Sequence, residues 1–188
     1  MTPTSAPCRF LPGLFGLALG AALLASLTGC FGQEETRRPD PKAMTSDDQS
    51  YFCGMTAAGH PGPKAQIHLL GKDAPLWFAA TRDAVGFLRL PDENNEITAI
   101  YVTDMAKADW NHPDPGPWIA LEQATLVIES KRRGGMGAPA VIPFSNPVAA
   151  RDFIQQNGGR IVALDDIPSD YVLGMVDIPD NPDLSGFQ

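Results

Sequence analysis

The segment Cys53-Gly54-Met55 places a thiol and a thioether two residues apart, a pair that could bind a soft metal ion. If the segment is extended, both side chains project to the same face, so both sulfurs can reach one bound atom. In a helix they would point about 200° apart and share no ligand. Gly54 carries no side chain and permits an unusual turn, which would also let the sulfurs converge. A thiolate with a thioether suits Cu(I) and suits magnesium, calcium or manganese poorly.

Zinc is a weaker candidate for this pair of sulfurs. Structural zinc normally takes four Cys and His ligands, and the chain has no Cys-x-x-Cys. A second methionine lies in Gly134-Gly135-Met136-Gly137, where the glycines indicate a loop. A methionine on a glycine loop has few core neighbours, so Met136 is a candidate third ligand. An accidental surface position is the alternative.

The N-terminus has the composition of a secretory signal. Arg9 precedes an apolar run from Phe10 to Leu27, and small residues follow. The sequence Leu27-Thr28-Gly29-Cys30 resembles the lipobox of bacterial lipoproteins, which implies removal of residues 1–29 and attachment of acyl chains such as palmitate to Cys30. The alternative is an uncleaved transmembrane helix, but Pro12 and several glycines interrupt the apolar run.

Cysteine usage narrows the role of Cys53. Cys8 would leave with the signal and Cys30 would carry lipid, so Cys53 would be the only free thiol and no internal disulfide could form. Such a thiol can be buried and inert, paired with another molecule, or used for metal binding or redox chemistry.

The charge balance argues against a nucleic-acid partner. The signal carries Arg9 and no acid, so 13 of the 14 Lys and Arg remain in the mature chain against all 22 Asp and Glu. Phosphate binding depends on a basic surface that this composition lacks. The acidic surface would keep the protein soluble, and long-range attraction of cations or basic partner proteins is the alternative.

The patterning predicts a signal, a tether and two similar folded units. Residues 30–50 are polar and contain prolines, which indicates a flexible tether. Periodicity and turn residues predict one helix and several short strands in each half of the remainder. The expected strands are 65–70, 76–78, 97–102, 124–128, 140–144 and 161–163, and the expected helices are 81–88 and one opened by Asn146-Pro147 and ended by Asn157-Gly158-Gly159.

The two halves indicate an internal duplication. A shift of 66 residues places Phe78 on Phe144, Ala84 on Ala150 and Phe87 on Phe153; chance alignment is the alternative. We therefore expect an α+β fold of two related, packed ββαβ units, at residues 51–110 with Cys-Gly-Met and 111–165 with Gly-Met-Gly. Residues 166–188 form a C-terminal extension that packs along the surface or trails off. No glycine-rich phosphate loop and no nucleophile elbow is present.

Several elements in this order resemble the NosL family, lipoprotein accessory factors of nitrous-oxide reductase maturation in denitrification. They are the lipobox Cys30, Cys53-Gly54-Met55, Asp109-Trp110 before Trp118-Ile119, Gly135-Met136-Gly137, and the helix end from Phe153 to Gly159. The resemblance implies two ββαβ units and a Cu(I) chaperone, with the thiolate of Cys53 and the thioethers of Met55 and Met136 as metal ligands.

The resemblance also implies partners and a location. The partners would be apo nitrous-oxide reductase and its ABC-type maturation complex, and the lipid on Cys30 would hold the protein at the periplasmic face of a membrane, the outer rather than the inner. Many members carry a second Cys before Cys-Gly-Met, where this chain has Tyr51-Phe52, which excludes a two-thiolate site.

A histidine and a methionine outside this set could also offer donors. His60 lies on a Gly and Pro loop and could reach the metal, but the favoured interpretation is an exposed loop histidine. Met105 could offer a spare sulfur, and edge packing explains it equally well. His68 and His112 receive no role, and Trp110 and Trp118 are expected to support the fold. We predict a binding protein with no catalytic residue. The alternatives are an enzyme with Cys53 as nucleophile, which would need a nearby base or cation, and a scaffold with a buried Cys53.

Overall fold

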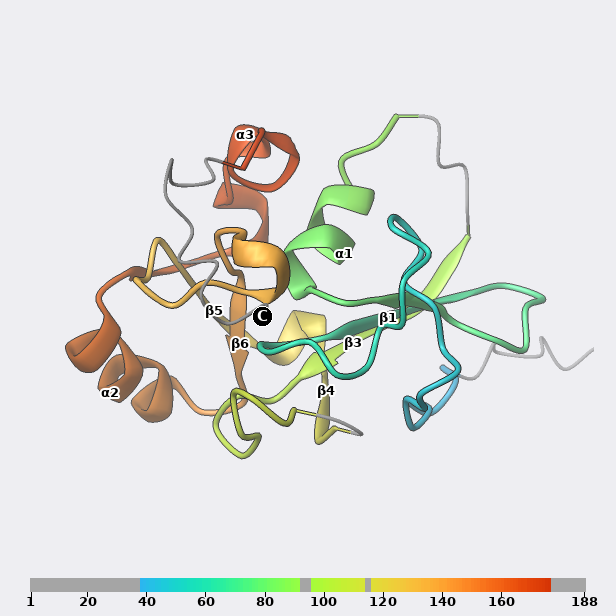
Figure 1. The fold of residues 1–188 in the computed structure, drawn as a ribbon, viewed down its shortest axis with the longest axis horizontal. Coiled ribbons are helices and arrows are strands. Elements are labelled where there is room, and N and C mark those ends of the chain that lie inside the picture. The colour runs from blue at the N-terminus through green and yellow to red at the C-terminus, as the bar shows by residue number, and fades with distance from the viewer. Residues whose placement is uncertain (1–37, 92–95, 114–115, 177–188) are drawn as a thin grey trace, which may run out of the picture. The chain divides into compact units, whose positions relative to one another are not determined.

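The computed structural model describes residues 38–91, 96–113 and 116–176, which form one compact unit (Figure 1). The predicted signal peptide and Cys30 lie outside the described residues. Within these ranges, no helix is both long enough and apolar enough to cross a bilayer.

The first sheet has four antiparallel strands in the order β2-β1-β3-β4. Its strands are β1 (Ala65–Leu69), β2 (Leu76–Phe78), β3 (Ile97–Thr103) and β4 (Trp118–Ala120). Helix α1 (Thr81–Phe87) follows β2. The first three strands and α1 confirm the predicted ββαβ unit.

The second sheet has three antiparallel strands in the order β6-β5-β7. Its strands are β5 (Thr125–Ile128), β6 (Ile142–Phe144) and β7 (Arg160–Val162), and α2 (Pro147–Asn157) follows β6. In each unit the first strand is central and the other two flank it. The first helical residues, Thr81 and Pro147, are 66 positions apart, as the internal alignment predicts.

Helix α2 begins and ends where its sequence signals predict. The side chain of Asn146 accepts a hydrogen bond from the backbone N–H of Val148 at 2.8 Å, which satisfies one of the free donors of the first turn. At the other end, Gly158 adopts φ +70°, and its N–H donates to the carbonyl of Ile154.

The two units share one hydrophobic core. Leu126 and Ile128 of β5 face the side chains of the first sheet and of α1, whereas Val127 between them faces α2 and β6. This alternation is the period-two pattern of a strand, and here both of its faces are buried. Strand β5 therefore joins the main core to a second cluster beneath α2.

Four elements differ from the sequence predictions. Strand β4 was not predicted from the sequence. It pairs with β3, so the first sheet extends beyond the expected boundary at residues 110 and 111. The C-terminal extension contains α3 (Ser169–Leu173) and enters the core through Ile167 and Val172, and the 3-10 turn Leu164–Asp166 leads into it. The 3-10 turn Leu121–Gln123 was also not predicted.

The predicted flexible tether is wrong for residues 38–50. The buried amide of Gln66 accepts from the N–H of Lys42 at 2.8 Å and donates to its carbonyl at 2.9 Å. Met44 is buried with Trp77, and Arg38 forms an ion pair with Glu122. The segment is polar and has no periodicity, and the order comes from tertiary contacts that local composition does not reveal.

A buried carboxylate joins the end of β3 to the end of β6. The side chain of Asp104 is fully buried and accepts from the Ser145 N–H at 2.9 Å and hydroxyl at 2.6 Å. It also accepts from the Ala106 N–H and pairs with Lys107 at 3.1 Å. Burial raises the carboxyl pKa, but these hydrogen bonds outweigh it, so the pKa of Asp104 lies below its ordinary value.

Replacement of Asp104 by Asn should lower the free energy of unfolding at pH 7 by about 2–3 kcal/mol, because buried donors lose a charged acceptor. A carboxyl whose folded pKa is lowered stabilises the fold above its unfolded pKa of about 4, and this stabilisation is lost as the pH falls through the folded pKa. The gap between wild type and Asp104→Asn in urea unfolding should therefore narrow below pH 4.

Asp152→Asn, at an exposed site on α2, serves as the control, and its free energy of unfolding should equal that of the wild type. Equal unfolding free energies for wild type and Asp104→Asn at pH 7 would contradict this role of Asp104.

Candidate functional site

Cys53 lies in a tight loop formed by residues 49–56, called here the Cys53 loop. Gln49 and Thr56 pair across its base, and the N–H of Gly54 donates to the carbonyl of Ser50 at 2.8 Å. Gly54 has φ +66°, a conformation that costs glycine little. The segment is not extended, because Cys53 is part of a turn. The prediction that Gly54 permits an unusual turn is confirmed.

The Cys53 loop is attached to the first sheet and to α1. The N–H of Tyr51 donates to the carbonyl of Trp77 in β2 at 2.8 Å. The ring of Tyr51 lies edge-on to Phe87, with centroids 5.4 Å apart, and the ring of Phe52 lies 5.6 Å from Phe78. These contacts hold the backbone immediately before the thiol, and Cys53 itself is free and exposed.

Residues 134–138 form a second loop, called here the Gly-Met-Gly loop. It contains the 3-10 turn Gly135–Gly137, and the N–H of Gly134 donates to the carbonyl of Ala138 at 2.9 Å. The loop approaches His60 closely, because a Cβ built on Gly135 would lie 3.2 Å from the Cβ of His60. The glycine at position 135 therefore permits this approach to the first unit.

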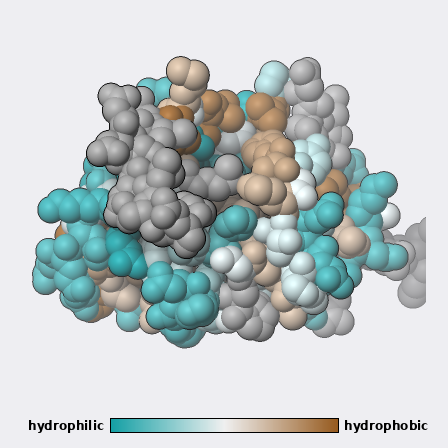
Figure 2. Space-filling model, in the orientation of Figure 1, coloured by the Kyte–Doolittle hydropathy of each residue, from teal (hydrophilic) through white to brown (hydrophobic). Residues whose placement is uncertain are grey.

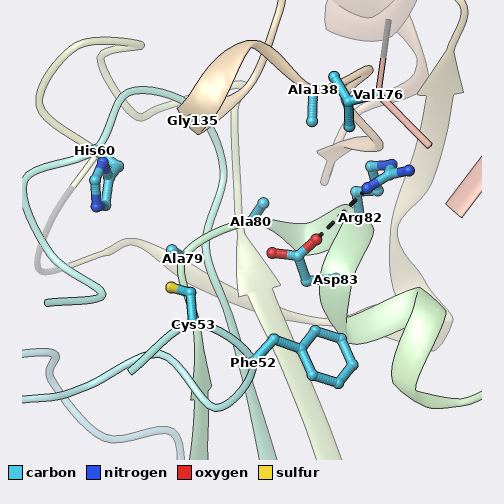
Figure 3. A pocket seen from close by; sticks show the side chains of 10 residues that line it. All are labelled: Phe52, Cys53, His60, Ala79, Ala80, Arg82, Asp83, Gly135, Ala138 and Val176. Atoms are coloured by element: carbon cyan, nitrogen blue, oxygen red, sulfur yellow. Dashed lines mark ion pairs between the residues drawn. The ribbon is translucent and has the colours of Figure 1, made fainter. Parts of the chain in front are cut away.

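The two loops meet at one pocket of about 310 Å³ (Figure 3). Its lining is more apolar than polar and comes from the Cys53 loop, the segment with His60, the start of α1, the Gly-Met-Gly loop and the C-terminal segment. The lining residues are Phe52, Cys53, His60, Ala79, Ala80, Arg82, Asp83, Gly135, Ala138 and Val176. In this view the sulfur of Cys53 lies between Phe52 and His60, beside Ala79.

The predicted ligands differ in how the structure places them. Cys53 lines the pocket, and Met136 follows the lining residue Gly135 in the chain. Met55 is 42% exposed and does not line the pocket. Its backbone carbonyl accepts from the N–H of Ser50 across the Cys53 loop. The structure thus brings together the two segments that carry the three sulfurs.

The structure also places the remaining histidines, Met105 and the two tryptophans considered from the sequence. His60 lines the pocket with Cys53, whereas Met105 packs against the second core cluster, in agreement with edge packing. Trp110 stacks on Phe153 with an 18° interplanar angle, and Trp118 lies 6.1 Å from Trp77, as expected for tryptophans that support the fold. His68 is buried and His112 is exposed.

A buried cation and a carboxylate at the start of α1 were missed from the sequence. Arg82 and Asp83 both line the pocket, and they form an ion pair with 3.8 Å between nitrogen and oxygen. Burial raises the pKa of Asp83, and the positive charge of Arg82 opposes part of that rise. The sequence signal that could have indicated this pair is two adjacent charged residues at the start of an otherwise apolar helix.

An apolar surface flanks this pocket. Figure 2 shows apolar side chains gathered over α1, whereas the lower part of the same view is mostly hydrophilic. The exposed side chains of Tyr51, Phe52 and Met55 belong to the Cys53 loop beside α1. The pocket, its free thiol and its apolar rim define a small α+β binding protein with an accessible soft donor.

The chain belongs to the NosL family. The family model described as NosL matches residues 41–172. The copper-binding lipoprotein NosL of Achromobacter cycloclastes is 43% identical over 166 residues, which cover 87% of this chain and 86% of that protein. The copper-binding lipoprotein NosL of Stutzerimonas stutzeri is 30% identical over 153 residues, 81% of this chain and 79% of that protein.

A solved structure also matches. It is the crystal structure of the copper chaperone NosL from Shewanella denitrificans, with a TM-score of 0.64 and 30% identity, covering 68% of this chain and 95% of that one. The relatives are named as binding proteins and a chaperone, not as enzymes, in agreement with the predicted class of protein.

Proposed function

We propose that this protein is a membrane-anchored chaperone that binds one Cu(I) ion through the thiolate of Cys53 and the thioethers of Met55 and Met136. The observation that carries the proposal is the pocket where the Cys53 loop meets the Gly-Met-Gly loop. The family relatives are named for copper binding and copper chaperone function, which supports copper as the cargo.

The donor chemistry favours the cuprous ion. Thiolate and thioether sulfurs are soft ligands that select Cu(I) over hard cations. Met55 can reach an ion on Cys53 from its exposed position, because methionine has three rotatable bonds and a polarizable sulfur. His60 lines the same pocket and is a further donor within the site.

Release proceeds by ligand exchange. Cys53 is exposed, so a sulfur ligand of an acceptor protein can add to the ion before the Cys53 thiolate departs. Thioethers are neutral ligands, and the ion can leave them without proton uptake at the methionines. The exposed apolar side chains Tyr51 and Phe52 provide contact surface for the acceptor beside the thiol.

The acceptors in this proposal are apo nitrous-oxide reductase and its ABC-type maturation complex, at the periplasmic face of the outer membrane. Lipid on Cys30 supplies the anchor. Seven residues, 31–37, lie between Cys30 and the first described residue, Arg38, and the eight chain steps from Cys30 to Arg38 span at most about 28 Å. The chaperone is thereby held close to the lipid surface.

Copper titration of the purified mature lipoprotein tests the metal site. We expect one Cu(I) per chain with sulfur-dominated X-ray absorption, and no binding by Cys53→Ala because the only thiolate is lost. Met55→Leu and Met136→Leu should each weaken affinity about tenfold or more, equivalent to about 1.4 kcal/mol. Their folds should persist because Met and Leu have similar volumes.

Met105→Leu is the matched control, since this thioether packs beneath α2 and should not change the affinity. Full Cu(I) uptake by Cys53→Ala would contradict the proposed site, because Cu(I) would then bind without the Cys53 thiolate.

Replacement of Cys30 by Ala should move the protein from the membrane fraction to the soluble fraction, because no acyl chain can be attached. Several acyl chains, at about 0.8 kcal/mol for each buried methylene, otherwise make release negligible. Cys8→Ala is the control and should leave the protein in the membrane fraction. Fractionation followed by immunoblotting is the measurement, and a membrane-bound Cys30→Ala protein would argue for an uncleaved helix instead.

A further inference from the structure

Arg82 connects α1 to the C-terminal segment, residues 167–176. The side chain is buried, and its guanidinium donates to the carbonyl of Tyr171 at 3.0 Å and to that of Gly174 at 2.9 Å. Both carbonyls lie at the C-terminal end of α3, where helix carbonyls lack partners within the helix. Arg82 therefore holds the end of α3 against the first unit.

Tyr171 connects the same helix to the second unit. Its hydroxyl donates to the carbonyl of Ala140 at 3.0 Å and accepts from the N–H of Glu129 at 2.9 Å. Glu129 follows β5 and has φ +61°, which is uncommon for a residue with a side chain. Residues 129 and 140 flank the stretch that carries Met136, so one hydroxyl fixes both ends of that stretch. Burial raises the pKa of Tyr171, which keeps the hydroxyl protonated as a donor.

Packing reinforces these hydrogen bonds. Ile167 and Val172 are buried in the core that the two sheets share. Gly86 of α1 lies so close to α3 that a Cβ there would approach Leu173 Cδ2 to 3.3 Å and the carbonyl oxygen of Val172 to 3.4 Å. The C-terminal segment is thus in contact with both units at once.

The same segment borders the pocket. Val176 and Arg82 both line it, together with Ala138 of the Gly-Met-Gly loop. In the view of Figure 3, Ala138 and Val176 lie side by side above Arg82, and Cys53 and Phe52 lie below the carboxylate of Asp83. Figure 1 shows α3 beside α1, with α2 far from both.

We propose that the C-terminal segment braces the pocket, with Arg82 and Tyr171 as positioning residues that set the separation between the Cys53 loop and the Gly-Met-Gly loop. This inference rests on the proposed Cu(I) function. A three-sulfur site built from two loops binds tightly only when both are held at the coordination distance, because ordering a loose loop costs conformational entropy. The brace supplies that order before the ion arrives.

Tyr171→Phe is the principal test, measured in the mature lipoprotein by competitive Cu(I) titration and Cu K-edge X-ray absorption. The variant keeps the ring and loses both hydrogen bonds of the hydroxyl. We expect the affinity for Cu(I) to fall about tenfold and the number of sulfur ligands to fall from three to two, with Cys53 and Met55 remaining bound. If Tyr171 only stabilised the fold, Tyr171→Phe would lower the melting temperature and change neither the Cu(I) affinity nor the number of sulfur ligands.

Tyr101→Phe is the matched control. Its hydroxyl also makes two hydrogen bonds, with Arg38 and with the carbonyl of Pro39, but it lies on the face of the first sheet covered by residues 38–44. Arg82→Lys is a second variant, which keeps the charge but cannot reproduce the two guanidinium hydrogen bonds to the carbonyls of Tyr171 and Gly174. It is measured in the same way and decides the question if Tyr171→Phe does not fold.

The outcomes separate the two proposals. Weaker binding with a lost sulfur in Tyr171→Phe or Arg82→Lys, and not in Tyr101→Phe, supports the brace. Wild-type affinity and ligand number in the folded variants overturn the brace and leave the copper site standing. A wild-type protein that takes up no Cu(I) overturns both.

Discussion

The buried carboxylate of Asp104 is the contact on which the arrangement of the two ββαβ units depends. It accepts hydrogen bonds from the backbone and hydroxyl of Ser145, and the N–H of Met105 donates to the carbonyl of Pro143 beside it. These bonds join the end of β3 to the segment around the end of β6. The first sheet carries the Cys53 loop, and β5 and β6 flank the Gly-Met-Gly loop. The junction therefore fixes where the two loops meet.

The pocket combines firm support with an accessible donor. Aromatic contacts to Phe78 and Phe87 and the backbone bond to Trp77 hold the Cys53 loop, yet Cys53 itself stays exposed. A carrier must bind its ion specifically and also release it. In the proposed function, soft sulfur donors would supply the selectivity for Cu(I), and exposure of the thiol would leave a path for an incoming ligand. The same short loop is thus held by the core and exposes its thiol to solvent.

Local sequence signals predicted the elements that depend on local physics. The cap at Asn146, the glycine stop at Gly158 and strand β5 all lie where the sequence indicated, and so does the repeated ββαβ order. Features that depend on tertiary contacts were not predicted. Gln66 orders a polar segment, and Arg82 reaches carbonyls about ninety positions away. Composition and periodicity carry no information about such distant partners.

The central claim is that sulfurs from both units bind a single cuprous ion. Selenomethionine in place of every methionine gives the thioether ligands a distinct X-ray scatterer. The most direct measurement is the Cu K-edge absorption fine structure of this labelled protein loaded with one Cu(I). The account predicts one sulfur and two selenium neighbours, with one selenium lost in Met55→Leu and one in Met136→Leu. A spectrum without selenium, or one that Met136→Leu leaves unchanged, would contradict it.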